Sequence, residues 1–269
     1  MLTYIFAALS VLGSILLVFG TQIHWLWLLP IVIGLFAALN ASFFLVLWFS
    51  TIFLPSVKKP IEKPRNFYGI IHFVCDWIIT LLRVNVKFNG MEKFPEEPFV
   101  IVSNHISNFD PVVVLAKMKG RKIAFISKPS NFKIPVAGPY THNAGFLAID
   151  RQNAMKAMRT IKRAAELVVS EQMIMGIYPE GTRSKTGELL EFKEGAFLLA
   201  KRSGAPIVVI STRGTNKISR RVFIKKTHVD MKVLDVIDKE TVKTLSLGEL
   251  ALRVRNTVAA DLSLTEEGK

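Results

Sequence analysis

The sequence predicts an α/β domain, with helices flanking a mixed sheet, preceded by an N-terminal transmembrane helical hairpin. From residue 84 onward, short apolar runs alternate with amphipathic stretches, as strands and helices do in one layered domain. The first 55 residues, by contrast, contain no Asp, Glu, Lys or Arg, although the chain has 35 basic and 21 acidic residues. We therefore expect a hairpin at 1–55, an interfacial helical segment at 56–83 and the α/β domain at 84–265.

Two apolar runs, residues 2–20 and 26–54, are each long enough to cross the hydrocarbon core of a bilayer as a helix. The second run is longer than a perpendicular span requires, so it would tilt or protrude. The alternative for the first run is a cleaved signal peptide, which is disfavoured because no Lys or Arg precedes the apolar stretch. Basic residues follow the second run: Lys58, Lys59, Lys63 and Arg65. Since positive charge favours the cytoplasm, we expect the downstream domain on the cytoplasmic face of the cell membrane.

Residues 66–83 form a third apolar run that includes Trp77 and is interrupted by charged residues. This mixture is typical of a helix lying on the bilayer surface, although a core helix of the following domain is the alternative. The run holds the only cysteine, Cys75, so an intramolecular disulfide is excluded. A lone cysteine among apolar neighbours is more often a packing residue than a nucleophile.

The net charge of +14 falls entirely on residues 56–269, because the hairpin carries none. A surface this basic suits an anionic membrane, a phosphorylated substrate or an acidic carrier, although it also serves solubility. The neighbouring hairpin favours anionic lipid as the partner. Nucleic acid is disfavoured as a partner because the sequence has no recognisable nucleic-acid-binding module or helical basic stripe.

Hydrophobic periodicity places the elements of the α/β domain. The expected strands are 84–88, 98–103, 122–127, 145–149, 173–178, 206–212 and two more within 222–237. The expected helices are 111–118, 153–170, 193–203 and 246–262. Helix 153–170 has an apolar stripe that we expect to face the core: Met158, Ile161, Ala165 and Val168.

The segment that follows strand 98–103 carries the strongest chemical signal. It places His105 at the strand exit and Asp110-Pro111 at a helix start, with Asp at the N-cap and Pro at the first helical position. The short loop between them allows the carboxylate to meet one imidazole nitrogen, which leaves the other nitrogen to take a proton from a hydroxyl. No serine belongs to this pair, so the hydroxyl would come from the substrate. A structural loop histidine and a plain helix cap are the alternatives.

Three further segments place cations at strand ends, where ligands bind in α/β sheets. After strand 173–178, Gly181 permits a sharp turn and Arg183 offers a bidentate grip on phosphate. Arg151 follows strand 145–149 and is either a second phosphate ligand or the partner of Asp150. Lys128 follows strand 122–127 as another candidate.

Taken together, these segments resemble the PlsC family, the 1-acyl-sn-glycerol-3-phosphate acyltransferases of the glycerolipid acyltransferase superfamily. The resemblance covers roughly residues 84–240 and rests on four ordered blocks. They are Asn104-His105 with Asp110, Gly145-Phe146 to Arg151, Glu180-Gly181-Thr182-Arg183-Ser184, and Ala205-Pro206-Ile207-Val208-Val209-Ile210, with Lys128 between the first two. Val209 stands where the fourth block usually has a second proline, and Pro129-Ser130-Asn131 departs from the family pattern after Lys128.

The resemblance implies the glycerolipid acyltransferase fold and a reaction. His105 takes the proton of the sn-2 hydroxyl of lysophosphatidic acid, whose oxygen attacks the thioester of acyl-CoA or acyl carrier protein. Asp110 holds the tautomer of His105. The residues implied in substrate binding are Glu180, Gly181, Thr182, Arg183, Arg151 and Lys128. The product is phosphatidic acid, made for phospholipid biosynthesis, and the resemblance implies neither cofactor nor metal.

Other functions remain open at this point. The acceptor is otherwise another lysophospholipid or glycerol 3-phosphate. A membrane esterase or phospholipase would need its own nucleophile, yet the chain has no Gly-x-Ser-x-Gly. A non-enzymatic lipid-binding protein would explain the hairpin and the basic domain, but not the ordered blocks.

Overall fold

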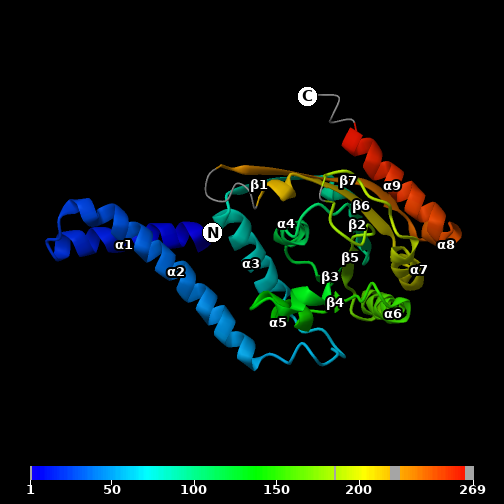
Figure 1. Cartoon of the computed structure of the whole chain (residues 1–269), viewed down its shortest axis with the longest axis horizontal. Coiled ribbons are helices and arrows are strands. Elements are labelled where there is room, and N and C mark those ends of the chain that lie inside the picture. Colours follow the sequence, from blue (N-terminus) through cyan, green and yellow to red (C-terminus); the bar gives the residue numbers. More distant parts are fainter. Residues whose placement is uncertain (1, 185, 219–224, 264–269) are drawn as a thin grey trace. The chain divides into compact units, whose positions relative to one another are not determined.

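The structure is a computed structural model that describes residues 2–184, 186–218 and 225–263. It divides the chain into two compact units, Met1–Ser56 and Val57–Lys269, coloured from blue to red along the sequence (Figure 1). The smaller unit is called the hairpin below, and the larger one the catalytic unit.

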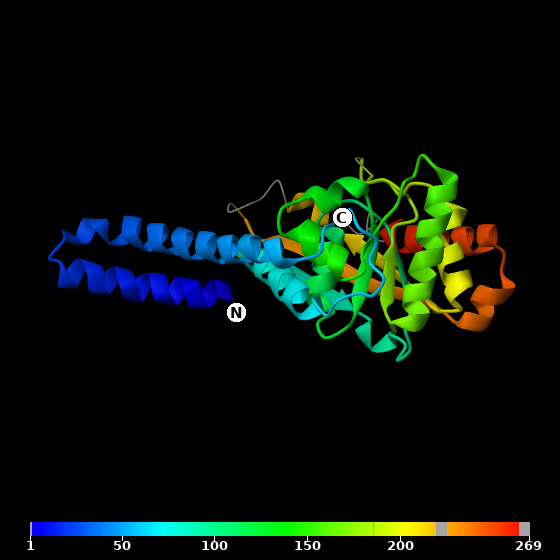
Figure 2. The same ribbon diagram turned by 90° about the horizontal axis from the view of Figure 1, so that it is seen from below.

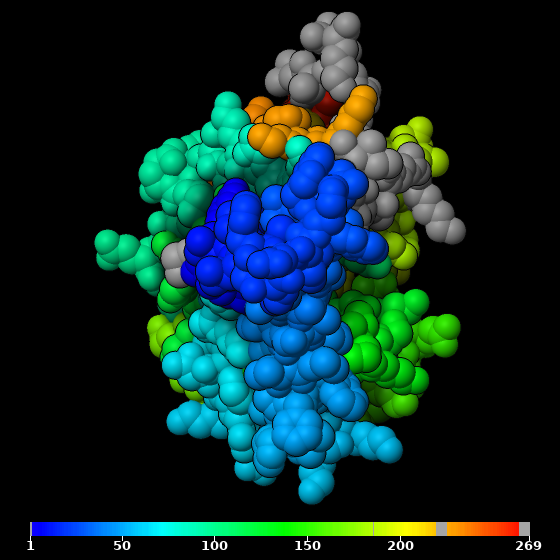
Figure 3. Space-filling model, turned by 90° about the vertical axis from the view of Figure 1, so that its left-hand side faces the viewer, coloured from blue at the N-terminus to red at the C-terminus, as the bar shows by residue number. Residues whose placement is uncertain are grey.

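The hairpin consists of helices α1 (Leu2–Gly20) and α2 (Leu28–Ser50), which run side by side in both ribbon views (Figures 1 and 2). Small residues line the contact: a Cβ added to Gly13 would lie 3.3 Å from Leu35 Cδ1, and Ser10 and Ser14 are fully buried. Both hydroxyls donate within α1, Ser10 to Phe6 O and Ser14 to Ser10 O. Small side chains let membrane helices approach closely, and Figure 3 shows the pair as one packed body.

The two apolar runs predicted to span a membrane correspond to Leu2–Gly20 and to the continuous helical stretch Trp25–Phe53 of 29 residues. That stretch is α2 together with a 3-10 turn at each end, Trp25–Trp27 and Thr51–Phe53. Most large apolar side chains of this unit are exposed, among them Leu16 at 72% and Phe19 at 76%. Apolar surface of this extent is unfavourable in water, so the hairpin associates the protein with a membrane.

A seven-stranded mixed sheet organises the catalytic unit, in the order β1-β7-β6-β2-β5-β3-β4. Strands β2 to β6 are mutually parallel, whereas β7 runs antiparallel to β6 and parallel to β1. The strands are β1 (Val84–Asn89), β2 (Val100–Ser103), β3 (Ile123–Ser127), β4 (Leu147–Ala148), β5 (Ile174–Ile177), β6 (Ile207–Arg213) and β7 (Thr227–Ile237). The C-terminal ends of β2 to β6 therefore share one edge of the sheet, where the loops carrying the predicted site emerge.

Helices cover both faces of the sheet, with α3 and α4 packed together on one side and α6, α7 and α9 on the other (Figure 1). The central strand β2 is buried along its length, as expected of a parallel strand covered on both faces. The helices of this unit are α3 (Tyr68–Leu81), α4 (Asp110–Lys117), α5 (Ala137–Asn143), α6 (Ala154–Ser170), α7 (Leu198–Ser203), α8 (Lys239–Thr244) and α9 (Leu247–Ser263). The predicted fold class, helices on a mixed sheet behind an apolar hairpin, is confirmed.

Helix α3 belongs by its contacts to the catalytic unit. Its buried side chains include Ile71 and Ile79, and it packs on α4 and β1. His72 joins it to the neighbouring segment, with Nδ1 2.6 Å from Leu115 O and Nε2 2.8 Å from Arg121 O. Burial raises the pKa of the Cys75 thiol to about 12, with a smaller contribution from Asp76, as fits a packing cysteine. The alternative interpretation of this segment, a core helix of the following domain, therefore fits the buried face of α3. Its placement on a bilayer remains a prediction.

The segment that leads from residue 57 to α3 is fixed to the same unit. Arg163 on α6 donates to the carbonyl oxygens of Ile61 and Glu62, and the Arg65 N–H donates to Asn143 O at 2.8 Å. Figure 2 shows this segment passing beside α5 before it turns back to α3. These bonds satisfy backbone groups of a chain that has no regular structure of its own.

Several predicted elements differ from the structure. The two strands expected within 222–237 are, in the described residues from 225 onward, the single strand β7; residues 222–224 lie outside the described part. The helix expected at 193–203 is a 3-10 turn, Glu194–Ala196, followed by α7. Met158 is 43% exposed, so the core stripe of α6 consists of Ile161, Ala165 and Val168 without it. Helices α5 and α8 were not predicted.

Candidate active site

The loop that carries His105 is anchored before the histidine is reached. Asn104 is buried at the end of β2, where its side-chain N–H donates to Thr212 O at 2.9 Å. Its carbonyl oxygen accepts the Thr212 N–H at 2.8 Å, so the carboxamide continues the pairing of β2 with β6. The asparagine therefore fixes the point at which the chain leaves the sheet.

His105 and Asp110 form the pair predicted from their spacing. His105 Nδ1 lies 2.7 Å from Asp110 Oδ2, with side-chain exposures of 15% and 0%. The same oxygen accepts the N–H groups of Ile106 and Ser107, each at 2.9 Å. Asp110 is thus the first residue of α4 and closes the preceding loop; the N-cap position predicted for it belongs to Phe109. With Nδ1–H directed at a carboxylate, Nε2 is the proton-accepting nitrogen.

Tyr178 forms one wall of the His105 site. Its ring stacks on the imidazole with centroids 4.3 Å apart and planes 17° apart, and Phe125 stacks on the far side at 5.7 Å. Burial, and secondly the charge of Asp110, hold the pKa of Tyr178 well above its usual value, so the phenol is neutral at physiological pH. Among the described residues no hydrogen-bond partner is found for its buried hydroxyl.

Glu180 supports the site from beneath. It is 3% exposed, and its Oε1 accepts the His105 backbone N–H at 2.6 Å while Oε2 accepts the Leu190 N–H at 3.2 Å. Burial raises the pKa of this carboxyl, although the two backbone N–H groups act in the opposite direction. Both carboxylate oxygens of Glu180 therefore accept hydrogen bonds from backbone N–H groups of the protein itself.

Positive side chains surround the same edge of the sheet. Lys128, Arg151 and Arg183 follow β3, β4 and β5, and all three are exposed. Asp150 pairs with Lys156 at 3.7 Å, which removes the alternative that Arg151 serves only as its partner. Within residues 2–184, 186–218 and 225–263, none of the three makes an ion pair.

The turn that carries Arg183 is built on Gly181, whose φ of +69° lies in the left-handed region. A Cβ at this position would lie 3.1 Å from Lys193 Cε and 3.2 Å from Lys193 Nζ, so the lysine lies directly across the turn. Thr182 is exposed beside it. The Ser184 N–H donates to His105 O at 2.9 Å, which joins this turn to the histidine loop.

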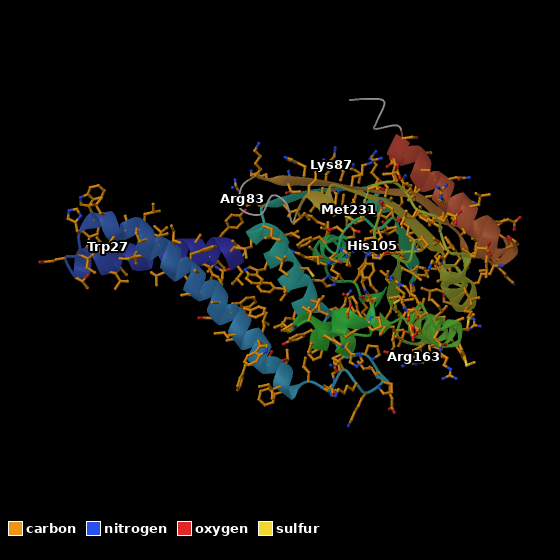
Figure 4. The ribbon with its side chains drawn as sticks, viewed as in Figure 1. Trp27, Arg83, Lys87, His105, Arg163 and Met231 are labelled. Atoms are coloured by element: carbon orange, nitrogen blue, oxygen red, sulfur yellow. The ribbon has the colours of Figure 1, made fainter. Side chains whose placement is uncertain are left out.

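The structure therefore brings His105 into direct contact with Asp110 and Glu180, and the three predicted cations follow strand ends at the same edge of the sheet. Figure 4 labels His105 within the catalytic unit. Two contributors were missed at the level of sequence. Lys193 had no motif of its own. Thr215, whose hydroxyl donates to Asp110 Oδ1, lies 105 residues away from its partner, so no local pattern joins the two. Among the described residues, no cluster of three or more His, Cys, Asp or Glu with the geometry of a metal site is found.

Comparison with known proteins agrees with this geometry. Residues 85–213 match the acyltransferase family model. The chain is 40% identical over 156 residues to a chloroplast 1-acyl-sn-glycerol-3-phosphate acyltransferase of Brassica napus, covering 57% of this chain and 44% of that protein. It is 29% identical over 220 residues to the Saccharomyces cerevisiae 1-acyl-sn-glycerol-3-phosphate acyltransferase, covering 73% of this chain and 72% of that protein. The chain thus spans less than half of the Brassica protein and about seven-tenths of the yeast protein.

A solved structure extends the agreement to the fold. The crystal structure of the 1-acyl-sn-glycerophosphate (LPA) acyltransferase PlsC from Thermotoga maritima superposes with a TM-score of 0.63 at 23% identity. The match covers 85% of this chain and 89% of that one. Residues 85–213 are thus similar to the acyltransferase family, and the chain has the fold of the solved PlsC structure.

Proposed function

We propose that the protein is a membrane-bound 1-acyl-sn-glycerol-3-phosphate acyltransferase. It transfers an acyl chain from acyl-CoA or acyl carrier protein to the sn-2 hydroxyl of lysophosphatidic acid and so forms phosphatidic acid. The observation that carries the proposal is the His105–Asp110 pair, with Nδ1 held at 2.7 Å and Nε2 left to face a substrate. The printed names of the relatives support the same acceptor.

The reaction follows from the roles of the two ring nitrogens. His105 Nε2 removes the proton of the sn-2 hydroxyl as the oxygen attacks the thioester carbonyl carbon, and Asp110 stabilises the resulting imidazolium. The tetrahedral intermediate collapses with cleavage of the carbon–sulfur bond. The leaving thiolate takes the proton back from His105, so the ester and the free thiol are the only products and the enzyme is unchanged.

The cations supply the phosphate site in this proposal. Arg183 and Arg151 offer planar donor pairs suited to phosphate oxygens, and Lys128 adds a point charge. None of the three makes an ion pair among the described residues, so each is available to a ligand. Glu180 does not touch substrate in this scheme; it holds the His105 backbone.

The test is acyl transfer by the purified full chain in detergent, with His105→Ala as the control. Donors are labelled acyl-CoA and acyl carrier protein; acceptors are lysophosphatidic acid, glycerol 3-phosphate and lysophosphatidylcholine. Phosphatidic acid formed from lysophosphatidic acid and lost by at least about 10²-fold in the variant supports the proposal. Product from another acceptor alone would change the substrate and keep the mechanism. If no acyl group is transferred from any donor, the non-enzymatic lipid-binding function would be favoured instead.

We further propose that the catalytic unit lies on the cytoplasmic face of the cell membrane. The basic residues that follow the hairpin, Lys58, Lys59, Lys63 and Arg65, support this orientation. In right-side-out vesicles a protease added outside should leave a C-terminal tag intact, and detergent should expose it. Cleavage of the tag without detergent would reverse the orientation.

A further inference from the structure

The carboxylate of Asp110 has two oxygens with separate partners. Oδ2 accepts His105 Nδ1–H and the N–H groups of Ile106 and Ser107. Oδ1 accepts the hydroxyl of Thr215. Asp110 and Thr215 are both 0% exposed, so water does not reach the bond between them. In the described part of the chain, Thr215 is the donor found at Oδ1.

The chain brings Thr215 to this place by a turn that requires glycine. Strand β6 ends at Arg213, and Gly214 follows with φ +85° and ψ −10°. A Cβ there would lie 2.4 Å from His228 O, closer than any real Cβ contact. The turn passes directly into a 3-10 helix, Thr215–Lys217, so the hydroxyl is presented by a rigid element.

We propose that Thr215 is a positioning residue for the acyl transfer, whose hydroxyl fixes the rotation of the Asp110 carboxylate so that Oδ2 faces His105 throughout the proton transfer. This inference rests on the proposed function. The terminal torsion of an aspartate is broad, so donors on one oxygen alone leave the plane of the carboxylate less well defined than donors on both. A buried carboxylate oxygen without a donor also concentrates its charge on the remaining partners, here the imidazole of His105.

Loss of the hydroxyl has two expected consequences. The less constrained carboxylate lowers kcat by roughly 3- to 30-fold, which is about 0.6–2 kcal/mol at 1.36 kcal/mol per tenfold change. The stronger attraction of Asp110 for the imidazolium formed during proton transfer should displace the acid limb of the kcat profile toward higher pH. The other titratable groups at His105 are Glu180, bonded to its backbone, and Tyr178, stacked on its ring; neither contacts Thr215.

The test compares Thr215→Val, which keeps the shape and removes the hydroxyl, with Thr215→Ser, which keeps the hydroxyl. For the full chain in detergent we would measure kcat, both KM values, the pH profile of kcat and thermal unfolding. We expect Thr215→Val to lower kcat and to displace the acid limb of its pH profile, while KM for acceptor and donor stays unchanged. Thr215→Ser should keep most of the wild-type kcat. In the Asp110→Asn background, Val should have little further effect.

Several results would overturn the inference. One is a folded Val variant with the wild-type kcat and pH profile; another is a folded Ser variant as impaired as Val. If Val does not fold, Thr215→Ala takes its place, and a loss of kcat by Ala that adds in full to the loss by Asp110→Asn decides against the inference. Failure of the wild-type chain to transfer acyl groups would instead remove the proposed function, so the two failures are distinct.

Discussion

The carboxylate of Glu180 lies 2.6 Å from the backbone nitrogen of His105, although 75 residues separate the two in the sequence. The Ser184 N–H binds the carbonyl of the same histidine at 2.9 Å. The turn between Glu180 and Ser184 therefore holds both sides of the His105 backbone, while Asp110 holds its side chain. Arg183 lies within this turn, so the proposed phosphate ligand and the proposed base are positioned by one element.

Replacement of Glu180 by Gln should change how stability depends on pH. Burial raises the pKa of Glu180 above its ordinary value of 4.5, so the folded state binds this proton more tightly than the unfolded chain does. The contribution of Glu180 to stability is therefore greatest below pH 4.5 and declines as pH rises through the raised value. Glu180→Gln has no such decline. We would measure melting temperatures of both proteins from pH 4 to 8. The melting temperature of the wild type should fall relative to that of the variant as pH rises. A difference that stays constant over this range would contradict the raised pKa of Glu180.

Replacement of Asp110 by Asn should lower kcat by about 10²- to 10⁴-fold. The neutral amide cannot stabilise the imidazolium as the carboxylate does, and its NH₂ group must face either Thr215, which donates to Oδ1, or the nitrogens that donate to Oδ2. His105 then loses the partner that fixes its tautomer. Initial rates at saturating substrate, with melting as the folding control, check this expectation. A folded variant within a factor of a few of wild type would show that Asp110 only closes the loop.

The contact between His105 and Asp110 was predictable because the two residues lie close together in the sequence. The five-residue spacing of His105 and Asp110, and Asp-Pro at a helix start, predicted a contact that the structure places at 2.7 Å. Strand ends placed the three cations on one edge for the same reason. The role of Asp110 as an N-cap was wrong, because two N–H groups of the preceding loop take the oxygen that a cap would use.

The remainder depends on the order of strands, which periodicity does not encode. Thr215 reaches Asp110 because β6 lies beside β2, and Glu180 reaches His105 because β5 lies on its other side. Strand β7 was divided in two at the level of sequence, although its alternation of buried and less buried residues is that of one continuous strand. The hairpin, by contrast, follows from composition alone.

Replacement of Arg183 by Ala should act on acceptor binding. Loss of an exposed guanidinium that binds phosphate should raise KM for lysophosphatidic acid by about tenfold or more, with a smaller change in kcat. Arg202 provides the matched control, because it is also exposed but lies at the end of α7 before β6 begins, at the opposite edge of the sheet. Arg202→Ala should leave KM unchanged. Equal effects of the two variants would point to general charge attraction instead of a phosphate contact.

Replacement of Gly176 by Ala should destabilise the catalytic unit by about 1–3 kcal/mol. This glycine lies in the middle of β5, where a Cβ would fall 2.2 Å from the ring of Phe125, itself 2% exposed and unable to move away. The same ring stacks on Tyr178, so the strain reaches the His105 site. Gly69 in α3 is the control, because no atom lies within 4 Å of its added Cβ and alanine favours a helix. Melting curves should show a loss for the first variant and no loss for the second.

Replacement of Asp261 by Asn should loosen α9 from the sheet. Asp261 is 13% exposed; its Oδ2 accepts from Ser211 at 2.9 Å and from Arg213, and its Oδ1 accepts from Lys232 at 3.0 Å. Burial alone would raise the pKa of this carboxyl, but the hydrogen bonds from Lys232 and Ser211 and the charges of Arg213 and Lys232 outweigh it and lower the pKa below 3.8. The stabilisation is therefore present at neutral pH and is lost as pH falls through the lowered value.

The expected loss for Asp261→Asn is about 1–3 kcal/mol at pH 7, since two cations and a hydroxyl lose a charged acceptor in a mostly buried site. Asp235→Asn is the control: its pair with Arg253 has the same 3.0 Å distance, but the side chains are 32% and 43% exposed, so its loss should stay below about 1 kcal/mol. Unfolding in detergent at pH 7 and at an acidic pH well below 3.8 separates the two. Asp261→Asn should approach the wild type at the lower pH, because protonation removes the same charge. A difference that persists there would mean that shape, not charge, holds α9 against β6 and β7.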